Sequence, residues 1–291
     1  MLKDKNIIIF GGTGFVGEYL VKLLKRIEIQ VFVIYNNQMS NKEKKLGVKY
    51  YKLDLTKNSK VSPSIIKKID TAVIMTQPND LIMRNIIKIL NQANTLKKII
   101  YISTILVYPS SSKKIRETTT PAPESSYEKG KIKEEKLLTN YAKRRNIKLN
   151  IIRLANVYGN KKNRGIIGII FNSILNDRPI VVNGNGNQIR DYIFVEDAVK
   201  LINFLIFSGQ KNLVEIFNIC TGQGYTIQDL IKLAKKITKN EMNIKYSKPV
   251  KEKMAIVGDN KKILKVSKVR LSYDIIKGLK KTYLNYNHER I

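Results

Sequence analysis

The chain has 291 residues, and its 54 Lys and Arg residues against 23 Asp and Glu residues give a formal net charge of +31. This length suffices for one large α/β domain and a smaller lobe with a buried core. The single cysteine, Cys220, excludes an internal disulfide framework and a cysteine-based metal cluster. No apolar run reaches the roughly 20 residues that span a membrane, and the first residues do not resemble a secretory leader. We therefore expect a cytoplasmic protein without a bound metal.

The positive charge is spread along the chain and does not form one run. Lys, Asn and Ile abound together, as a translated AT-rich genome would produce. Compositional drift is our preferred interpretation, and a basic surface for nucleic acid is the alternative. Under either interpretation, a positive field raises the encounter rate with anionic ligands.

The N-terminal segment has the pattern of a strand, a tight turn and a helix. KNIIIF is a short apolar run, GGTGFVG follows at once, and EYLVKLLKRI has helical spacing. Gly11, Gly14 and Gly17 would let backbone N–H groups at a helix N-terminus approach a pyrophosphate. The segment therefore predicts dinucleotide binding.

Further along, predicted strands and helices alternate, which indicates a parallel sheet with helices on both faces. The predicted strands are Asn6–Phe10, Gln30–Tyr35, Lys49–Leu53, Thr71–Met75, Lys98–Ser103 and Lys148–Leu154. The predicted helices are Phe15–Arg26, Leu81–Ala93 and Tyr127–Arg144. Pro109–Ser126 is predicted to be a loop, because Pro121 and Pro123 forbid a regular strand ladder.

Tyr127 and Lys131 are four residues apart in the last predicted helix, so their side chains leave the same face. A neighbouring ammonium lowers the pKa of a phenol, and such a pair could move a proton on or off an alcohol. A solvated helix face would show the same spacing by chance. The pair gains meaning from the other motifs.

Several segments, in the correct order, resemble the extended short-chain dehydrogenases/reductases, specifically the NAD-dependent nucleotide-sugar epimerase/dehydratase family, and within it enzymes like UDP-glucose 4-epimerase. They are GGTGFVG, LDL at residues 53–55, YISTILVYP, the Tyr127 and Lys131 pair, RLANVYG, GNQIRDYIFVEDAVKLI and FNICTG. The resemblance implies a Rossmann doubly wound parallel sheet with a smaller C-terminal substrate-binding lobe. It also implies an NAD(P)-binding domain of residues 1–160 plus 191–220, and a substrate lobe of residues 161–190 plus 221–291.

The resemblance also implies roles for individual residues. The catalytic positions are Thr104, Tyr127 and Lys131. The cofactor positions are Gly11, Gly14, Phe15, Val16, Gly17, Asp54, Leu55, Tyr127 and Lys131, with Asp54 at the adenine. The substrate positions are Ser103, Asn156 and Arg190, with Arg190 on the phosphates of a nucleotide-diphosphate sugar. Thr104 could instead cap a loop at a strand end, and Arg190 beside Asp191 could be a structural ion pair.

One departure from the family pattern leaves the cofactor open between NAD and NADP. NAD-using members carry an acid at the end of the second strand, and Tyr35 occupies that place here. Because no carboxylate stands at this position, nothing there would repel the 2′-phosphate of NADP. Lys42, Lys44 and Lys45 follow shortly downstream.

A second departure bears on the reaction. Dehydratases of the family carry an Asp-Glu pair after the catalytic threonine, whereas Ile105 and Leu106 stand here, so dehydration is disfavoured. We expect a sugar-nucleotide 4-epimerase working through a transient 4-keto sugar, with an NADPH-dependent 4-keto-sugar reductase as the alternative. A second alternative, of another class, is an RNA-binding protein on a Rossmann scaffold. The helices Leu81–Ala93 and Tyr127–Arg144 resemble the family's dimer-forming pair, which predicts a homodimer.

Overall fold

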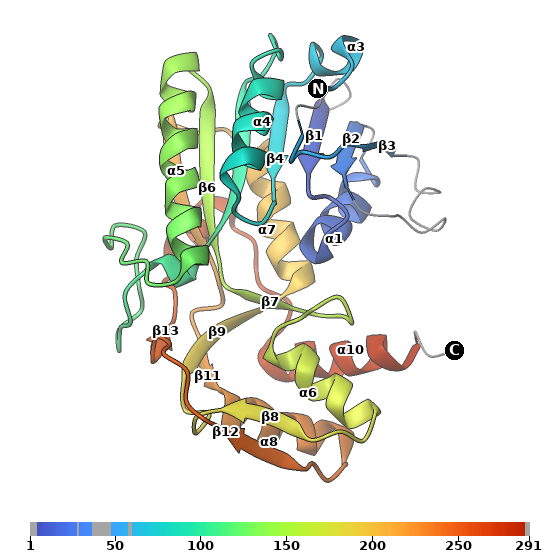
Figure 1. The fold of residues 1–291 in the computed structure, drawn as a ribbon, viewed down its shortest axis with the longest axis vertical. Coiled ribbons are helices and arrows are strands. Elements are labelled where there is room, and N and C mark those ends of the chain that lie inside the picture. The colour runs from blue at the N-terminus through green and yellow to red at the C-terminus, as the bar shows by residue number, and fades with distance from the viewer. Residues whose placement is uncertain (1–4, 28, 37–47, 58–59, 289–291) are drawn as a thin grey trace. The chain divides into compact units, whose positions relative to one another are not determined.

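The computed structural model describes residues 5–27, 29–36, 48–57 and 60–288, and Lys42, Lys44 and Lys45 lie outside these ranges. The chain divides into two compact units (Figure 1). Unit 1 comprises residues 1–107, 123–153 and 199–217, and unit 2 comprises residues 108–122, 154–198 and 218–291. Within the described ranges, none of the helices is both long and apolar enough to cross a membrane.

The seven-stranded sheet of unit 1 has the order β10-β6-β5-β4-β1-β2-β3. Its strands are β1 Asn6–Phe10, β2 Gln30–Tyr35, β3 Lys49–Lys52, β4 Thr71–Ile74, β5 Lys98–Thr104, β6 Lys148–Leu154 and β10 Val214–Ile219. The registered neighbours β1–β2, β2–β3, β1–β4 and β4–β5 run parallel. The central strands are buried on both faces, so they are continuous apolar runs instead of alternating ones.

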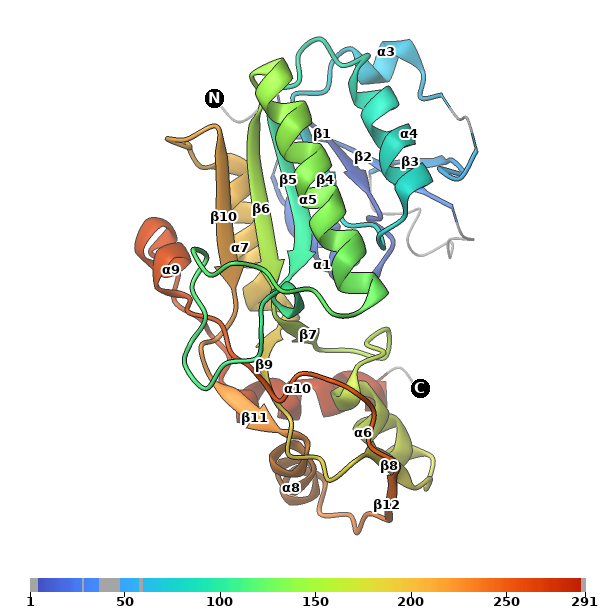
Figure 2. The same cartoon turned by 60° about the vertical axis from the view of Figure 1, so that its left-hand side comes forward.

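Helices cover both faces of this sheet, as the sequence predicts. They are α1 Phe15–Leu24, α3 Pro63–Ile66, α4 Asp80–Leu90, α5 Ser126–Arg145 and α7 Val195–Phe207, with the 3-10 helix η1 Ile105–Val107. Figures 1 and 2 show α4 and α5 on one face and α1 and α7 on the other. The predicted Rossmann doubly wound fold is confirmed.

The boundaries of α4 and α5 follow from their caps. The side chain of Asn79 accepts hydrogen bonds from the N–H groups of Leu81 and Ile82, and Ser125 accepts one from Glu128. Asn146, in the left-handed conformation with φ 52°, ends α5. The segment predicted as a loop before α5 contains no helix or strand beyond an isolated bridge between Ile115 and Gly258.

The described part of unit 2 contains short strands and four helices. A four-stranded sheet is built around β9 Ile189–Phe194, which pairs with β7 Asn156–Tyr158, β11 Gly224–Thr226 and β13 Ala255–Ile256. A separate ribbon joins β8 Ile180–Asn183 to β12 Ile244–Ser247. The helices are α6 Ile166–Leu175, α8 Ile227–Thr238, α9 Lys261–Ser267 and α10 Ile275–His288.

The division differs from the predicted boundaries of residues 1–160 plus 191–220 and 161–190 plus 221–291. Residues 108–122, 154–160, 191–198 and 218–220, all predicted for the cofactor domain, belong to unit 2. The physical reason is strand pairing, because β7 and β13 both join β9 and Ile115 bridges to Gly258. That the two units divide cofactor and substrate binding stays a prediction.

Candidate active site

The glycine turn after β1 leaves the start of α1 open. Gly11 has φ +84°, and a Cβ atom at Gly17 would lie 2.6 Å from the Gly11 carbonyl oxygen. Gly14, the residue before α1, has no side chain that could cap the helix. The first N–H groups of the helix therefore remain for an anion, and their partial positive charge favours one.

The end of β4 lies against this turn. A Cβ atom at Gly11 would lie 3.0 Å from the carbonyl oxygen of Met75. The next residue, Thr76, has a buried hydroxyl oxygen without a hydrogen-bond partner among the described residues. A buried orphan hydroxyl beside an open helix N-terminus suits a polar ligand. These observations fit the pyrophosphate and ribose groups of a dinucleotide.

The other predicted cofactor residues lie along the same sheet. Phe15 and Val16 are half-buried in the first turn of α1. Asp54 accepts hydrogen bonds from the N–H and hydroxyl of Thr56, which lower the pKa of its carboxyl. Leu55 packs in the apolar core, and its carbonyl oxygen accepts a hydrogen bond from the Asn85 side chain at 2.9 Å.

Lys131 fixes the beginning of α5 to the sheet. Its Nζ donates to the carbonyl oxygens of Thr76 and Ile102, each at 2.9 Å, and its side chain is 4% exposed. A Cβ atom at Gly130 would lie 2.8 Å from the Cβ atom of Pro78, so only glycine allows this close approach. An ammonium has three donors, and the two carbonyls leave one for a ligand.

Tyr127 is half-buried one turn before Lys131. Burial raises the pKa of its phenol, and the carboxylates of Glu134 and Glu128 raise it further. The sequence predicted a lowered pKa, and this prediction is wrong for the protein without ligands. The physical reason is that burial, and after it the carboxylates of Glu134 and Glu128, disfavour the phenolate, while the Lys131 ammonium is turned to the carbonyl oxygens of Thr76 and Ile102.

Thr104 and Ser103 end β5, and both are nearly buried. The Thr104 hydroxyl oxygen accepts a hydrogen bond from the Leu106 N–H at 3.2 Å, so it caps η1 while its proton stays available as a donor. Ser103 donates to a carboxylate oxygen of Glu135 at 2.5 Å. While that hydrogen bond is kept, Ser103 can contact a substrate only as an acceptor.

Sequence reasoning missed two buried carboxylates of α5, Glu134 and Glu135. Glu135 forms two hydrogen bonds with Arg153, at 3.2 and 2.7 Å. Glu134 accepts from the Tyr101 hydroxyl at 2.5 Å. The i, i+3 spacing of Glu134 from Lys131 was a signal that could have been used.

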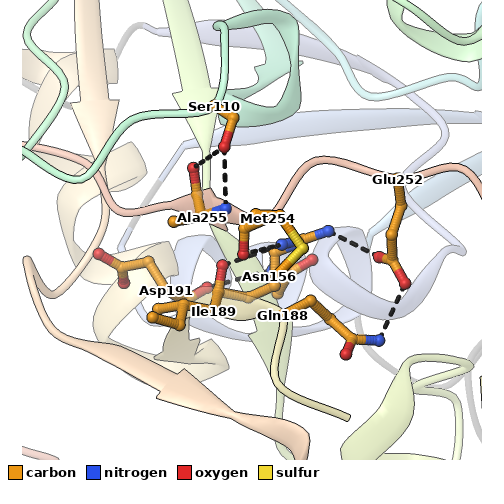
Figure 3. Close-up of polar contacts among 9 residues, drawn as sticks. Ser110, Asn156, Gln188, Ile189, Asp191, Glu252, Met254 and Ala255 are labelled. Carbon is orange, nitrogen blue, oxygen red and sulfur yellow. Dashed lines mark hydrogen bonds and ion pairs between the residues drawn. The ribbon is translucent and has the colours of Figure 1, made fainter. Parts of the chain in front are cut away.

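The predicted substrate residues of unit 2 are held by their own neighbours (Figure 3). Arg190 donates to Glu252 at 2.6 Å and to the carbonyl of Ile189 at 2.9 Å. Asn156 donates to the backbone carbonyl of Asp191 at 3.3 Å. Arg190 is thus ion-paired, although its partner is Glu252 and not the adjacent Asp191.

Asp191 has a different task. Its carboxylate accepts hydrogen bonds from the N–H and hydroxyl of Thr221 and from the N–H of Gly222. Burial raises the pKa of Asp191 to about 6, and these hydrogen bonds oppose the rise. Asp191 therefore fixes the turn between β10 and β11.

A cavity of about 770 Å³ lies beside the Arg190 and Glu252 pair within unit 2. Glu252, Gln188 and Met254 line it, and Gln188 also donates to Glu252 at 2.9 Å. Further polar lining comes from Asn183, Asn185, Gln228, Tyr246 and Ser247. The cavity offers several amide donors and acceptors, of the kind that read polar ring edges.

The parallel sheet, the open glycine turn and the Tyr127 and Lys131 helix together define the class of extended short-chain dehydrogenases/reductases. The model of the NAD dependent epimerase/dehydratase family matches residues 7–220, and the chain belongs to this family.

Named relatives agree on nucleotide-sugar chemistry. The chain is 28% identical to a dTDP-4-dehydro-6-deoxyglucose reductase of Escherichia coli, with 79% of this chain and 81% of the relative covered. It is 27% identical to a GDP-6-deoxy-D-talose 4-dehydrogenase of Aggregatibacter actinomycetemcomitans, with 90% of each covered. The structure is similar to a UDP-glucose 4-epimerase of Thermus thermophilus in complex with NAD, with a TM-score of 0.85, 19% identity, and 97% and 99% coverage. This last likeness concerns the fold.

Proposed function

We propose that the protein is an NAD(P)-dependent nucleotide-sugar 4-epimerase. The observation that carries the proposal is the docking of Lys131 on the ends of β4 and β5, one helical turn from Tyr127 and two residues from Thr104 along β5. This arrangement provides a phenol, an ammonium and a hydroxyl at the carboxyl edge of a parallel sheet, where open α/β sheets bind ligands.

Each of these side chains has a distinct task in the proposed reaction. Tyr127 takes the proton of the sugar C4 hydroxyl as general base and later returns it. The Thr104 hydroxyl donates to the same oxygen and fixes its direction, while its own oxygen stays bound by the Leu106 N–H. Lys131 holds the cofactor ribose with the donor that the carbonyls of Thr76 and Ile102 leave over.

The cofactor is proposed to lie along the glycine turn. Gly11, Gly14 and Gly17 admit the pyrophosphate at the N-terminus of α1, and Asp54 reaches the adenine. When bound, the nicotinamide supplies the hydride acceptor and donor. Tyr35 is half-buried at the end of β2, with its ring edge-on to Tyr50 at 6.3 Å, and it places no carboxylate there to reject NADP. NAD and NADP both remain within the proposal.

Dehydration is disfavoured, because the two positions after Thr104 carry no acidic or basic side chain. Ile105, 1% exposed, and Leu106 follow Thr104 in η1, and neither side chain can transfer a proton. The remaining reactions are epimerisation at C4 and reduction of a 4-keto sugar. The second candidate, an NADPH-dependent 4-keto-sugar reductase, is supported by Tyr35 and by the Escherichia coli relative, which is named as a reductase. An RNA-binding role stays a prediction that rests on net charge.

The substrate is proposed to place its nucleotide in unit 2. Arg190 is a forked donor that suits a diphosphate, and its present partner Glu252 would be displaced or re-paired on binding. Asn156 is proposed to face the sugar. The cavity beside this ion pair offers amide groups for a nucleobase and ribose. Comparing UDP-, dTDP- and GDP-sugars as substrates identifies the particular sugar and nucleobase.

We also propose a homodimer through α4 and α5. Their exposed residues are almost all basic or neutral, among them Arg84, Lys88, Lys129, Lys133 and Lys136. Like charges would face one another in a symmetric helix bundle, so the association should strengthen as salt screens them. Sedimentation at low and high ionic strength tests this, and a monomer at both would contradict it.

The assay that tests the function uses UDP-, dTDP- and GDP-sugars carrying deuterium at C4. An epimerase converts each accepted sugar into its 4-epimer, keeps the deuterium on C4 and consumes no added cofactor. A reductase leaves these sugars unepimerised and, when the corresponding 4-keto sugars are supplied in a parallel reaction, consumes one NADPH for each 4-keto sugar reduced. Chromatography with mass spectrometry separates these results. Binding of NAD(P) without either reaction would refute both candidate activities.

A further inference from the structure

A carboxylate with almost no exposure lies directly behind the Tyr127 and Lys131 pair. The Glu134 side chain is 1% exposed and lies 4.0 Å from the Lys131 Nζ. Its Oε2 accepts from the Tyr101 hydroxyl at 2.5 Å, and its Oε1 accepts from the Asn79 N–H at 3.0 Å. None of the roles proposed for Thr104, Tyr127 and Lys131 involves this carboxylate.

Two opposing effects act on the Glu134 carboxyl. Burial is the larger and raises its pKa above the usual value, while the Tyr101 hydroxyl, the Lys131 ammonium and the Asn79 N–H limit the rise. Asp80, at the start of α4, is the nearby charge that opposes ionisation, and it is itself paired with Lys133. The two hydrogen-bond donors and the cation therefore offset part of the cost of burying this anion.

The positive charge of Lys131 is stabilised by neighbouring carboxylates. Burial lowers the pKa of its ammonium to about 8, and the carboxylates of Glu134 and Glu135 oppose this fall. The charge of Glu135 is already balanced by two hydrogen bonds from Arg153. Glu134 is therefore the carboxylate whose charge Lys131 itself compensates. The Tyr101 ring, with its centroid 5.0 Å from Nζ, completes the cation's surroundings.

We propose that Glu134 is a positioning residue of the catalytic pair: its carboxylate keeps Lys131 an ammonium, fixed against the carbonyls of Thr76 and Ile102 and ready to donate to the cofactor. The inference rests on the proposed function for its catalytic meaning. The same carboxylate raises the pKa of Tyr127. It therefore makes the proposed base harder to ionise while it stabilises the positive charge of Lys131.

The test is the titration of Lys131 in the full-length protein. Lysine labelled with ¹³C at the ε carbon reports protonation by NMR, and Lys131→Arg identifies the Lys131 signal by its loss. We expect a wild-type midpoint near pH 8 and a midpoint lower by about one to two pH units in Glu134→Gln. Glu134→Asp keeps the charge and should recover most of the shift.

Glu128→Gln is the matched control. Glu128 is also a buried carboxylate of α5, and its charge bears on Tyr127 and not on Lys131. The Lys131 midpoint should therefore stay unchanged in this variant. A merely structural loss that lets water reach Lys131 would raise its midpoint, because burial is what lowers it, so the expected fall distinguishes the two roles.

NAD titration at several pH values gives the second readout. Glu134→Gln should bind NAD as the wild type does near pH 5.5 and about tenfold more weakly near pH 7.5, where its Lys131 has lost the proton. An unchanged Lys131 midpoint would overturn the inference while leaving the proposed function intact. No NAD(P) binding by the wild type would remove the function while the titration result stood. If Glu134→Gln does not fold, a wild-type midpoint below about pH 6 overturns the inference alone.

Discussion

Unit 1 and unit 2 hold their candidate functional side chains in different ways. In unit 1, Lys131 and Thr104 are fixed by backbone groups at the ends of strands, and each keeps a donor for a ligand. In unit 2, Arg190 is already ion-paired with Glu252. The comparison teaches that the proposed catalytic side chains of unit 1 are organised in advance, whereas the proposed phosphate clamp must exchange one partner for another.

The largest expected effect is the loss of the proposed base. Tyr127→Phe removes the phenol oxygen and should lower the rate of hydride transfer by about 10³-fold or more, because a positioned acid–base group contributes about that much. NAD affinity should change little. Stopped-flow absorbance of the reduced nicotinamide measures the first quantity, and calorimetric titration measures the second.

The control for this variant is Tyr283→Phe in α10, where the ring stacks on Phe171 at 5.7 Å. It should retain the wild-type rate. Full activity of Tyr127→Phe would refute the assignment of the base.

The next effect concerns the close packing that lets unit 1 be organised in advance. A Cβ atom in Gly17→Ala would lie 2.6 Å from the Gly11 carbonyl and 2.7 Å from the Gly12 Cα. We expect a loss of about 1–3 kcal/mol of unfolding free energy and weaker NAD binding, because α1 must move away from its strand. Denaturant unfolding and NAD titration measure the two effects.

Gly209→Ala is the comparison for this variant, because a Cβ atom at Gly209 meets nothing within 4 Å. Its stability should stay within about 0.5 kcal/mol of the wild type. Equal stabilities of the two variants would show that the tight turn is not required.

A smaller effect tests the exchange of partners in unit 2. Arg190→Ala should weaken nucleoside-diphosphate binding about tenfold to a hundredfold, the size expected for charge-assisted hydrogen bonds, without changing NAD affinity. Glu252→Gln should strengthen nucleoside-diphosphate binding a few-fold, because the carboxylate that repels the diphosphate is removed.

Arg178→Ala, which changes an exposed arginine of the same unit, should have little effect on the same titration. If Arg190→Ala binds UDP, dTDP and GDP as tightly as the wild type, Arg190 is only a structural partner of Glu252.

The smallest expected effect lies at the end of β2. Tyr35→Asp should shift the ratio of NADP to NAD affinity towards NAD by about tenfold, because a carboxylate repels a 2′-phosphate and accepts from a 2′-hydroxyl. Tyr35→Phe, which keeps the ring and adds no charge, should leave the ratio unchanged. Paired titrations with both cofactors measure this, and an unchanged ratio in Tyr35→Asp would place the ribose elsewhere.

Much of unit 1 could be predicted from sequence because its signals are local. Strands β1, β2 and β6 have the predicted bounds, since each is an apolar run next to a turn. The start of α5 was also predicted to within one residue. The four-residue α3 was missed, because so short a helix has no periodicity to detect.

Unit 2 could not be predicted in the same way. Its sheet depends on β7 and β13, which have three and two residues and pair with a strand far away in sequence. Hydrogen-bond partners of functional side chains are also far apart in the sequence. In unit 2, Arg190 and Glu252 are 62 positions apart, and in unit 1, Tyr101 and Glu134 are 33 positions apart. The raised pKa of Tyr127 comes mainly from burial, with a further contribution from Glu134 and Glu128, and a motif alone does not reveal burial.

The most direct test of the proposed 4-epimerase is the mass spectrum of the small molecules released when freshly purified protein is denatured. An epimerase returns its hydride within each turnover and need not release its cofactor, so we expect close to one NAD per chain. An empty site that then binds NADPH in titration would contradict the epimerase and support the reductase. Binding of neither NAD nor NADP would contradict the account as a whole.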